Sequence, residues 1–267
     1  MKASLTVVAV IVALPAIGLS CRKSSPGGPS AAAPQGLSGR VTGVTWSNEP
    51  AGLTTLTDHT WTTLVDGGWN RRPSAYDRIV TDAPPPPASA LEYDFPEGFG
   101  GGFAPATHYF EVAGRRELFV GLEWKVSNPW QGHPSYVNKI QFIYTASSDI
   151  AMVMFGPNGG PFELRVMPQW PEHKTGWLTP NANGTAPALG SWQRVEWYLK
   201  YESSYGAGDG IVRWWLNGAL VGDYKNVRYP RDSGFNEYQI SPTWGGIGDV
   251  KRENDYYRFK QAYLSGR

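Results

Sequence analysis

The chain has 267 residues, a net charge of +1 and only 18% charged side chains, which excludes the strongly basic face that nucleic-acid binding requires. Its single cysteine, Cys21, excludes a disulfide, so the folded part must rely on its hydrophobic core alone. Aromatic content is high, with 12 Trp and 14 Tyr, and such rings serve both as core layers and as platforms for sugar rings.

The N-terminus has the pattern of an export signal. Lys2 precedes an apolar run, residues 5–19, that is too short for a membrane-spanning helix. Cys21 ends the sequence IGLSC, which resembles the lipobox of bacterial lipoproteins. We therefore expect residues 1–21 to be a lipoprotein-type signal peptide that ends at a lipidated Cys21. An ordinary cleaved signal with an incidental cysteine is the alternative.

The next stretch, residues 22–38, is rich in Ser, Pro, Gly and Ala and is typical of a flexible tether. Residues 39–267 suit one all-β domain. Together these features predict an exported protein of the bacterial cell envelope, lipid-anchored or secreted. We expect it to be a monomer that contacts the membrane only through its N-terminal lipid.

The first part of the domain is predicted to contain short strands and long connections. Strand candidates are Val41–Trp46, Thr60–Val65 and Leu91–Phe95. The loop around Arg71 and Arg72 either contacts an acidic sugar or is simply solvated. The connections also include a stiff segment with four consecutive prolines, residues 83–88, and the glycine-rich turn EGFGGGFAP, which lacks the strand-to-helix context of a phosphate loop.

Beyond residue 116 the alternation of apolar and polar residues is stronger, which favours strands. Asn217-Gly218 predicts a tight hairpin turn with positive φ. The many short strands and the lack of a helical pattern indicate a β-sandwich. The predicted strands are Glu117–Ser127, Tyr136–Thr145, Ile150–Phe155 (nearly all apolar, hence central and covered on both faces), Phe162–Pro168, Trp192–Tyr201, Ile211–Leu216, one within Val227–Gly248, and Asp255–Leu264.

A family resemblance rests on the segments SWQRVEWYLKYES, GAGDGIVRWWLNGALV and SPTWGGIGD, followed by YYRFKQAYLSG. Together they resemble the C-terminal half of concanavalin A-like jelly-roll proteins and are most similar to family 14-type polysaccharide lyases and their uncharacterised relatives. The resemblance covers residues 118–265. It implies a jelly-roll β-sandwich of two antiparallel sheets, with a polymer bound along the concave sheet. Lectins, hydrolases and lyases share this scaffold.

Charged and aromatic residues recur on one alternation face of several predicted strands. If these strands are neighbours, the residues form a strip with the donors and flat rings that a sugar-binding groove needs. The alternative is a solvated outer face with cross-strand ion pairs. The candidate substrate-binding residues are Glu123, Gln141, Arg194, Glu196, Arg213 and Trp215, with Trp130 and His133 from a loop.

The resemblance also implies a reaction, β-elimination from a uronic-acid polymer. This chemistry needs a group that neutralises the carboxylate, a base and an acid. Lys139 occupies the position of a functional lysine in the similar lyases, and Arg165 and Tyr198 are the other candidate catalytic residues. Tyr144 is a second candidate tyrosine, although by simple alternation it lies on the apolar side of its strand. The tyrosine pair of those lyases is not evident after the arginine strand, since the segment FELRVMPQW offers Met167 and Gln169 instead.

Two other functions stay open from the residues. One is a non-catalytic carbohydrate-binding lipoprotein. The other is a jelly-roll glycoside hydrolase, which needs two acidic residues close together, with Glu123, Glu163 and Glu196 as candidates.

No cofactor is predicted. A structural Ca²⁺ could be held by aspartates in glycine-rich turns, although turn aspartates also have ordinary local uses. The aspartates concerned are Asp209, Asp223 and Asp249.

Overall fold

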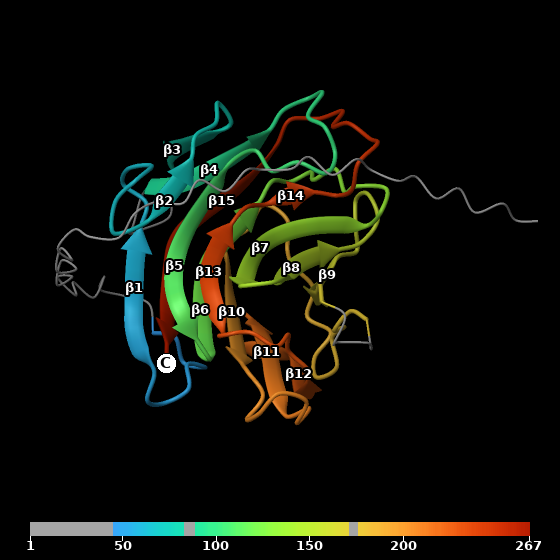
Figure 1. Cartoon of the computed structure of the whole chain (residues 1–267). Coiled ribbons are helices and arrows are strands. Elements are labelled where there is room, and N and C mark those ends of the chain that lie inside the picture. Colours follow the sequence, from blue (N-terminus) through green and yellow to red (C-terminus); the bar gives the residue numbers. More distant parts are fainter. Residues whose placement is uncertain (1–44, 83–88, 171–175) are drawn as a thin grey trace, which may run out of the picture. The chain divides into compact units, whose positions relative to one another are not determined.

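Two antiparallel sheets, and no helix, make up the part of the chain that the structure describes (Figure 1). The structure is a computed structural model that describes residues 45–82, 89–170 and 176–267. Sheet A contains β1 (Thr54–Thr60), β3 (Asp77–Thr81), β4 (Ser89–Phe95), β6 (Glu117–Val126), β10 (Gln193–Lys200), β11 (Gly210–Leu216), β12 (Ala219–Val227) and β15 (Asp255–Gly266). Sheet B contains β2 (Asn70–Arg72), β5 (Thr107–Arg115), β7 (Val137–Thr145), β8 (Asp149–Phe155), β9 (Glu163–Pro168), β13 (Phe235–Ile240) and β14 (Thr243–Trp244).

The strand order confirms the predicted jelly-roll sandwich. Sheet A runs β12-β11-β10-β6-β15-β4-β3, with β1 also paired to β15. Sheet B runs β2-β5-β13-β7-β8-β9, with β14 also paired to β7. Strands distant in sequence are therefore neighbours, so that β13 lies between β5 and β7 (Figure 1).

The core lies between the sheets and is built from the apolar face of each strand. In β10, Val195 and Trp197 are fully buried and pair with Leu122 and Val120 of β6. Sheet B contributes Ile150 and other apolar side chains to the same cluster. Each such side chain adds roughly 1.5–3 kcal/mol of burial free energy. The alternation in the sequence therefore placed these core residues correctly.

Several predicted elements differ in the structure. The strand expected at Thr60–Val65 lies earlier, at β1, because Trp61 leaves the strand and packs in the core. Strands β2, β3, β5 and β12 were not predicted, and β2 lies where a loop around Arg71 and Arg72 was expected. β5 lies between β2 and β13 in sheet B. The predicted signal peptide, the tether, the proline run 83–88 and residues 41–44 lie outside the described residues. Within the described ranges, no helix is long and apolar enough to cross a membrane.

The predicted hairpin turn is confirmed. Asn217 and Gly218 join β11 to β12 with φ values of 52° and 82°. Two successive positive φ angles are what a tight hairpin turn of this kind requires.

Strand β7 contains a bulge that the alternation pattern does not reveal. Lys139 is opposite Val153 in β8, yet Gln141 is opposite Met152, so Ile140 is an extra residue. A bulge shifts the side-chain alternation of the residues that follow it. Ile140 and Gln141 both point into the core, and Phe142 and Tyr144 point outward on the same face as Lys139.

Candidate functional site

The predicted site residues do not form one strip, because their strands belong to different sheets. Lys139 and Arg165 lie on the outer face of sheet B, on β7 and β9. The expectation that Tyr198 shares a site with Lys139 is wrong, since Tyr198 lies on sheet A. The outer face of sheet A carries Glu123, Arg194, Glu196, Tyr198, Arg213 and Trp215. Two of the carboxylates considered for a hydrolase, Glu123 and Glu196, lie on sheet A, and the third, Glu163, lies on sheet B.

The outer face of sheet A is an ion-paired and partly covered surface. Trp46 lies across it and packs on Tyr263, and a side chain at Gly121 would collide with the Trp46 ring at 2.5 Å. Asn48 donates a hydrogen bond to Glu196, which is fully buried. Elsewhere on this face Tyr198 donates to Glu117 at 3.0 Å, and Arg213 pairs with Asp223 at 2.6 Å. These contacts match the alternative of a face with cross-strand ion pairs.

Three further candidates are buried, which corrects their predicted contact with substrate. Trp130 stacks on Tyr257 in the core, with ring centroids 4.4 Å apart. His133 packs edge-on against Trp244, and its burial lowers its pKa. Gln141 is fully buried and accepts a hydrogen bond from the Tyr238 hydroxyl at 2.7 Å.

Gln141 is therefore expected to support the fold and not the binding of substrate. Gln141→Leu removes the acceptor of the buried Tyr238 hydroxyl, which is expected to lower the free energy of unfolding by about 1–3 kcal/mol. Urea denaturation measures this loss, and adding Tyr238→Phe should recover part of it, because both polar groups are then gone. A loss of polymer binding without a loss of stability would contradict this placement.

The outer face of sheet B brings together groups from several strands. The register pairs Tyr109 of β5 with Gln239 of β13, and Gln239 with Phe142 of β7. Lys139 and Tyr144 lie on either side of Phe142 along β7. Sequence reasoning missed Tyr109, because β5 was not recognised. It considered Tyr144 but placed this residue on the apolar side of its strand, because the bulge reverses the face of the residues that follow it. We call this surface the sheet B face.

Lys139 is the half-buried cation at the middle of the sheet B face. Its ammonium lies 5.2 Å from the centroid of the Phe142 ring. Burial lowers its pKa from 10.5, and the carboxylate of Asp149 opposes the shift. It makes no ion pair with any described residue. A desolvated amine without a direct ion pair loses its proton more readily than a solvated one, as a base requires.

Tyr144 holds its proton more strongly than a solvated tyrosine, in contrast to Lys139. Burial raises the pKa of Tyr144 to about 12, with smaller effects from the carboxylates of Asp149 and Glu237, while Arg72 opposes the shift. Its ring stacks with Phe142 at 5.9 Å. The phenol is therefore protonated at neutral pH and suited to donate a proton.

Two arginines supply further positive charge on the sheet B face. Arg165 stacks over the Phe155 ring at 3.7 Å, and Glu163 engages its Nε and Nη2. Its guanidinium has five N–H donors, and no hydrogen bond to a described residue other than Glu163 is made. Arg72 lies over the ring of Tyr109 at 5.8 Å and makes no ion pair within the described ranges. A surface with these cations suits an acidic sugar polymer.

In the described part of the chain, no three His, Cys, Asp or Glu residues gather in a group that could hold a metal ion. The aspartates considered for Ca²⁺ have local partners. Asp223 pairs with Arg213 and Lys225, and Asp209 accepts a hydrogen bond from the backbone of Ser203.

Comparisons with known proteins find similar folds among solved structures. No protein-family model and no curated protein match the sequence. Among solved structures, it is similar to a variant of the alginate lyase Aly36B bound to alginate trisaccharide, with 12% identity over 67% of this chain and 82% of that one, and a TM-score of 0.53. It is also similar to an endo-β-1,4-glucuronan lyase from the fungus Trichoderma reesei, with 17% identity over 80% of this chain and 96% of that one, and a TM-score of 0.51. A third similar structure is the alginate lyase vAL-1 from Chlorella virus, with 11% identity over 75% of this chain and 93% of that one, and a TM-score of 0.53. At these low sequence identities, the similarity shows a shared fold and nothing more.

Proposed function

We propose that this chain, which has the concanavalin A-like jelly-roll fold, binds a uronic-acid polysaccharide across the sheet B face and cleaves it by β-elimination. One observation carries the proposal: the bulge at Ile140 places Lys139 and Tyr144 on the same exposed face. The solved alginate and glucuronan lyases of similar fold support the choice of polymer class.

The two groups have complementary proton chemistry. Unprotonated Lys139 takes the proton from the carbon next to the sugar carboxylate, and the electrons of that C–H bond form the new double bond. The bond to the leaving oxygen breaks, and Tyr144 protonates that oxygen. Arg165 compensates the carboxylate charge while the proton is removed. Water then restores the proton to Tyr144 and removes one from Lys139.

The spacing suits groups that act on opposite sides of one sugar. Lys139 and Tyr144 are opposite Val153 and Asp149 of β8. Those partners are four residue steps apart along β8, so the backbones of Lys139 and Tyr144 are about 13 Å apart. Long side chains that converge from this separation leave room for a sugar ring between them.

The direct test is ultraviolet absorbance of the protein with alginate, glucuronan, pectate and heparinoids. Elimination creates a conjugated double bond that hydrolysis does not. A rising signal on one polymer would establish the activity and its substrate. Binding of a polymer without any rise would instead favour a non-catalytic carbohydrate-binding protein.

That second function has its own support on the sheet B face. Glu163 already neutralises much of Arg165, and Met167 takes the place where a lyase tyrosine was expected. A face with these features can hold an acidic polymer by charge and stacking alone.

The rate of elimination is expected to rise from neutral to alkaline pH. Only the unprotonated amine of Lys139 can accept a proton, and its lowered pKa centres the rise below pH 10.5. The rate should fall again near pH 12, where Tyr144 loses its proton. Initial rates by absorbance, with circular dichroism as a check on folding, measure this profile. A rate that falls across the alkaline range would contradict Lys139 as the base.

We also propose that the protein is located at the cell envelope. Export and attachment through a lipidated Cys21 would hold the domain at the cell envelope, where extracellular polysaccharide is accessible. Metabolic labelling with a fatty-acid analogue, with Cys21→Ser as the control, tests the anchor.

A further inference from the structure

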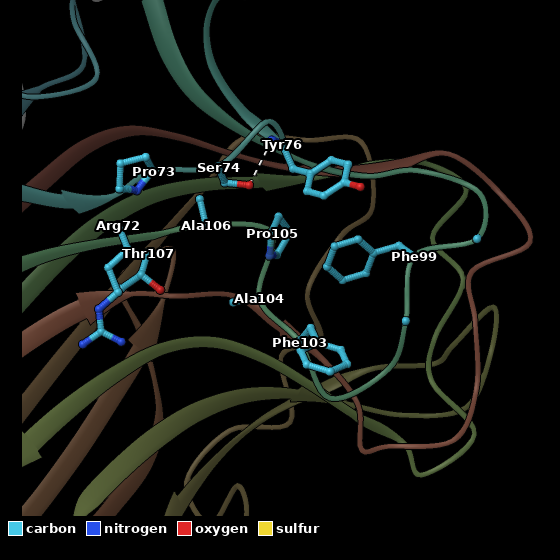
Figure 2. Close-up of a pocket in the computed structure, with 12 residues that line it drawn as sticks. Arg72, Pro73, Ser74, Tyr76, Phe99, Phe103, Ala104, Pro105, Ala106 and Thr107 are labelled. Atoms are coloured by element: carbon cyan, nitrogen blue, oxygen red, sulfur yellow. Dashed lines mark hydrogen bonds between the residues drawn. The ribbon is translucent and has the colours of Figure 1, made fainter. Parts of the chain in front are cut away.

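A pocket of about 580 Å³ adjoins the sheet B face at its β2 edge (Figure 2). This volume is typical of sites for small ligands. The rings of Tyr76, Phe99 and Phe103 group on one side of the pocket, and the Arg72 guanidinium lies on the other (Figure 2). Of the residues that line it, all of them described, Arg72 alone is charged. The pocket therefore offers flat apolar surface and one cation.

The rings of Phe103 and Tyr76 are exposed, although the turn that carries Phe103 is held by backbone hydrogen bonds. Phe103 is 64% exposed and Tyr76 is 41% exposed. The glycine-rich turn before Phe103 is tied to the 244–251 segment, with Gly101 N donating to Asp249 O and Gly102 N to Trp244 O, both at 2.8 Å. Gly102 has a φ of 84°, a conformation that side chains disfavour. The turn thus presents Phe103 in a preorganised position, which lowers the entropic cost of binding.

The pocket shares Arg72 and Thr107 with strands β2 and β5 of sheet B. Thr107, in its lining, is hydrogen-bonded to Ser241 through their hydroxyls at 2.8 Å. Arg72 lies over Tyr109 and also acts electrostatically on Tyr144, so its charge reaches both regions. β2 and β7 are separated by β5 and β13, which is three strand spacings or about 14 Å.

We propose that this pocket binds a second uronate residue of the same polymer chain, at a distance from the reacting sugar. The ring of that residue lies against Phe103 and Tyr76, and its carboxylate pairs with Arg72. Since about 14 Å separates β2 from β7, only an oligosaccharide can reach both the pocket and Lys139. The pocket would therefore set a preference for longer chains. This inference rests on the proposed function of the sheet B face.

The test uses the full chain with Lys139→Ala, so that bound sugars are not cleaved, and titrates uronate oligosaccharides of increasing length by calorimetry. Affinity is expected to rise once the oligosaccharide reaches the pocket. Tyr76→Ala with Phe103→Ala should weaken long oligosaccharides about tenfold and leave short ones unchanged. Both side chains are exposed, so folding should persist. The matched control is Tyr205→Ala, which removes a 59% exposed tyrosine from the loop between β10 and β11.

A second variant tests the charge. Arg72→Ala should weaken long uronate oligosaccharides about tenfold but not their carboxyl-reduced forms, and Arg72→Lys should recover part of the loss. If pocket variants bind every length as the parent does, the pocket is not a subsite, although cleavage of the polymer would stand. If no uronate oligosaccharide binds at any length, the proposed function and the pocket assignment are both overturned.

Discussion

Lys139→Ala is expected to lower the rate of elimination by about 100- to 10,000-fold, the usual contribution of a positioned base. Binding of the polymer should change by only a few fold, because Arg72 and Arg165 remain on the sheet B face. Absorbance measures the rate, and retardation in polymer-containing gels measures binding. If binding and turnover were lost together, Lys139 would be a binding residue.

Matched variants separate the two faces of the sandwich. Lys225→Ala removes an exposed lysine of β12, in sheet A, and should leave the rate unchanged. Tyr144→Phe should slow elimination, whereas Tyr198→Phe, on the outer face of sheet A, should not. A rate that depended on Tyr198 and not on Tyr144 would move the site to the other sheet.

Asp255→Ala is expected to destabilise the fold by about 3–5 kcal/mol, because it leaves the charge of Lys251 buried without its partner. The Lys251 ammonium lies 3.6 Å from the centroid of the Trp130 ring and 2.5 Å from Asp255 Oδ2. Asp255 also accepts hydrogen bonds from Ser127 and from the Gln131 backbone, so several groups lose their acceptor together. Urea denaturation at neutral pH measures the change.

The control for this pair is the double variant Lys251→Met with Asp255→Asn. It removes both charges and keeps one acceptor, so it should recover much of the lost stability. The same pair supports the pocket wall, since the backbone of Lys251 is hydrogen-bonded to Gly98 and Phe99. A wild-type midpoint in Asp255→Ala would show that Lys251 is neutral or solvated in the folded protein.

The sequence alone determined the all-β class, most of the strands and the inward faces of β6, β9, β10 and β11. These features depend on short-range alternation, which repeats with a period of two whatever the neighbouring strand is. Turn chemistry is equally local, so Asn217-Gly218 was identified correctly. Lys139 and Arg165 were placed on one face because each points outward from its own strand of sheet B.

Only the tertiary structure decided which residues meet. The sequence pattern assigns Lys139 to the polar face of its strand, and it does the same for Glu123, Glu196 and Tyr198. These three residues nevertheless lie on the other sheet, because strand pairing joins segments that are distant in the chain. The bulge at Ile140 sends Gln141 into the core and Tyr144 outward. The alternation of apolar and polar residues cannot reveal this bulge, because a bulge is defined by the register with the neighbouring strand. Pairing and register are properties of two strands together, and they created the sheet B face.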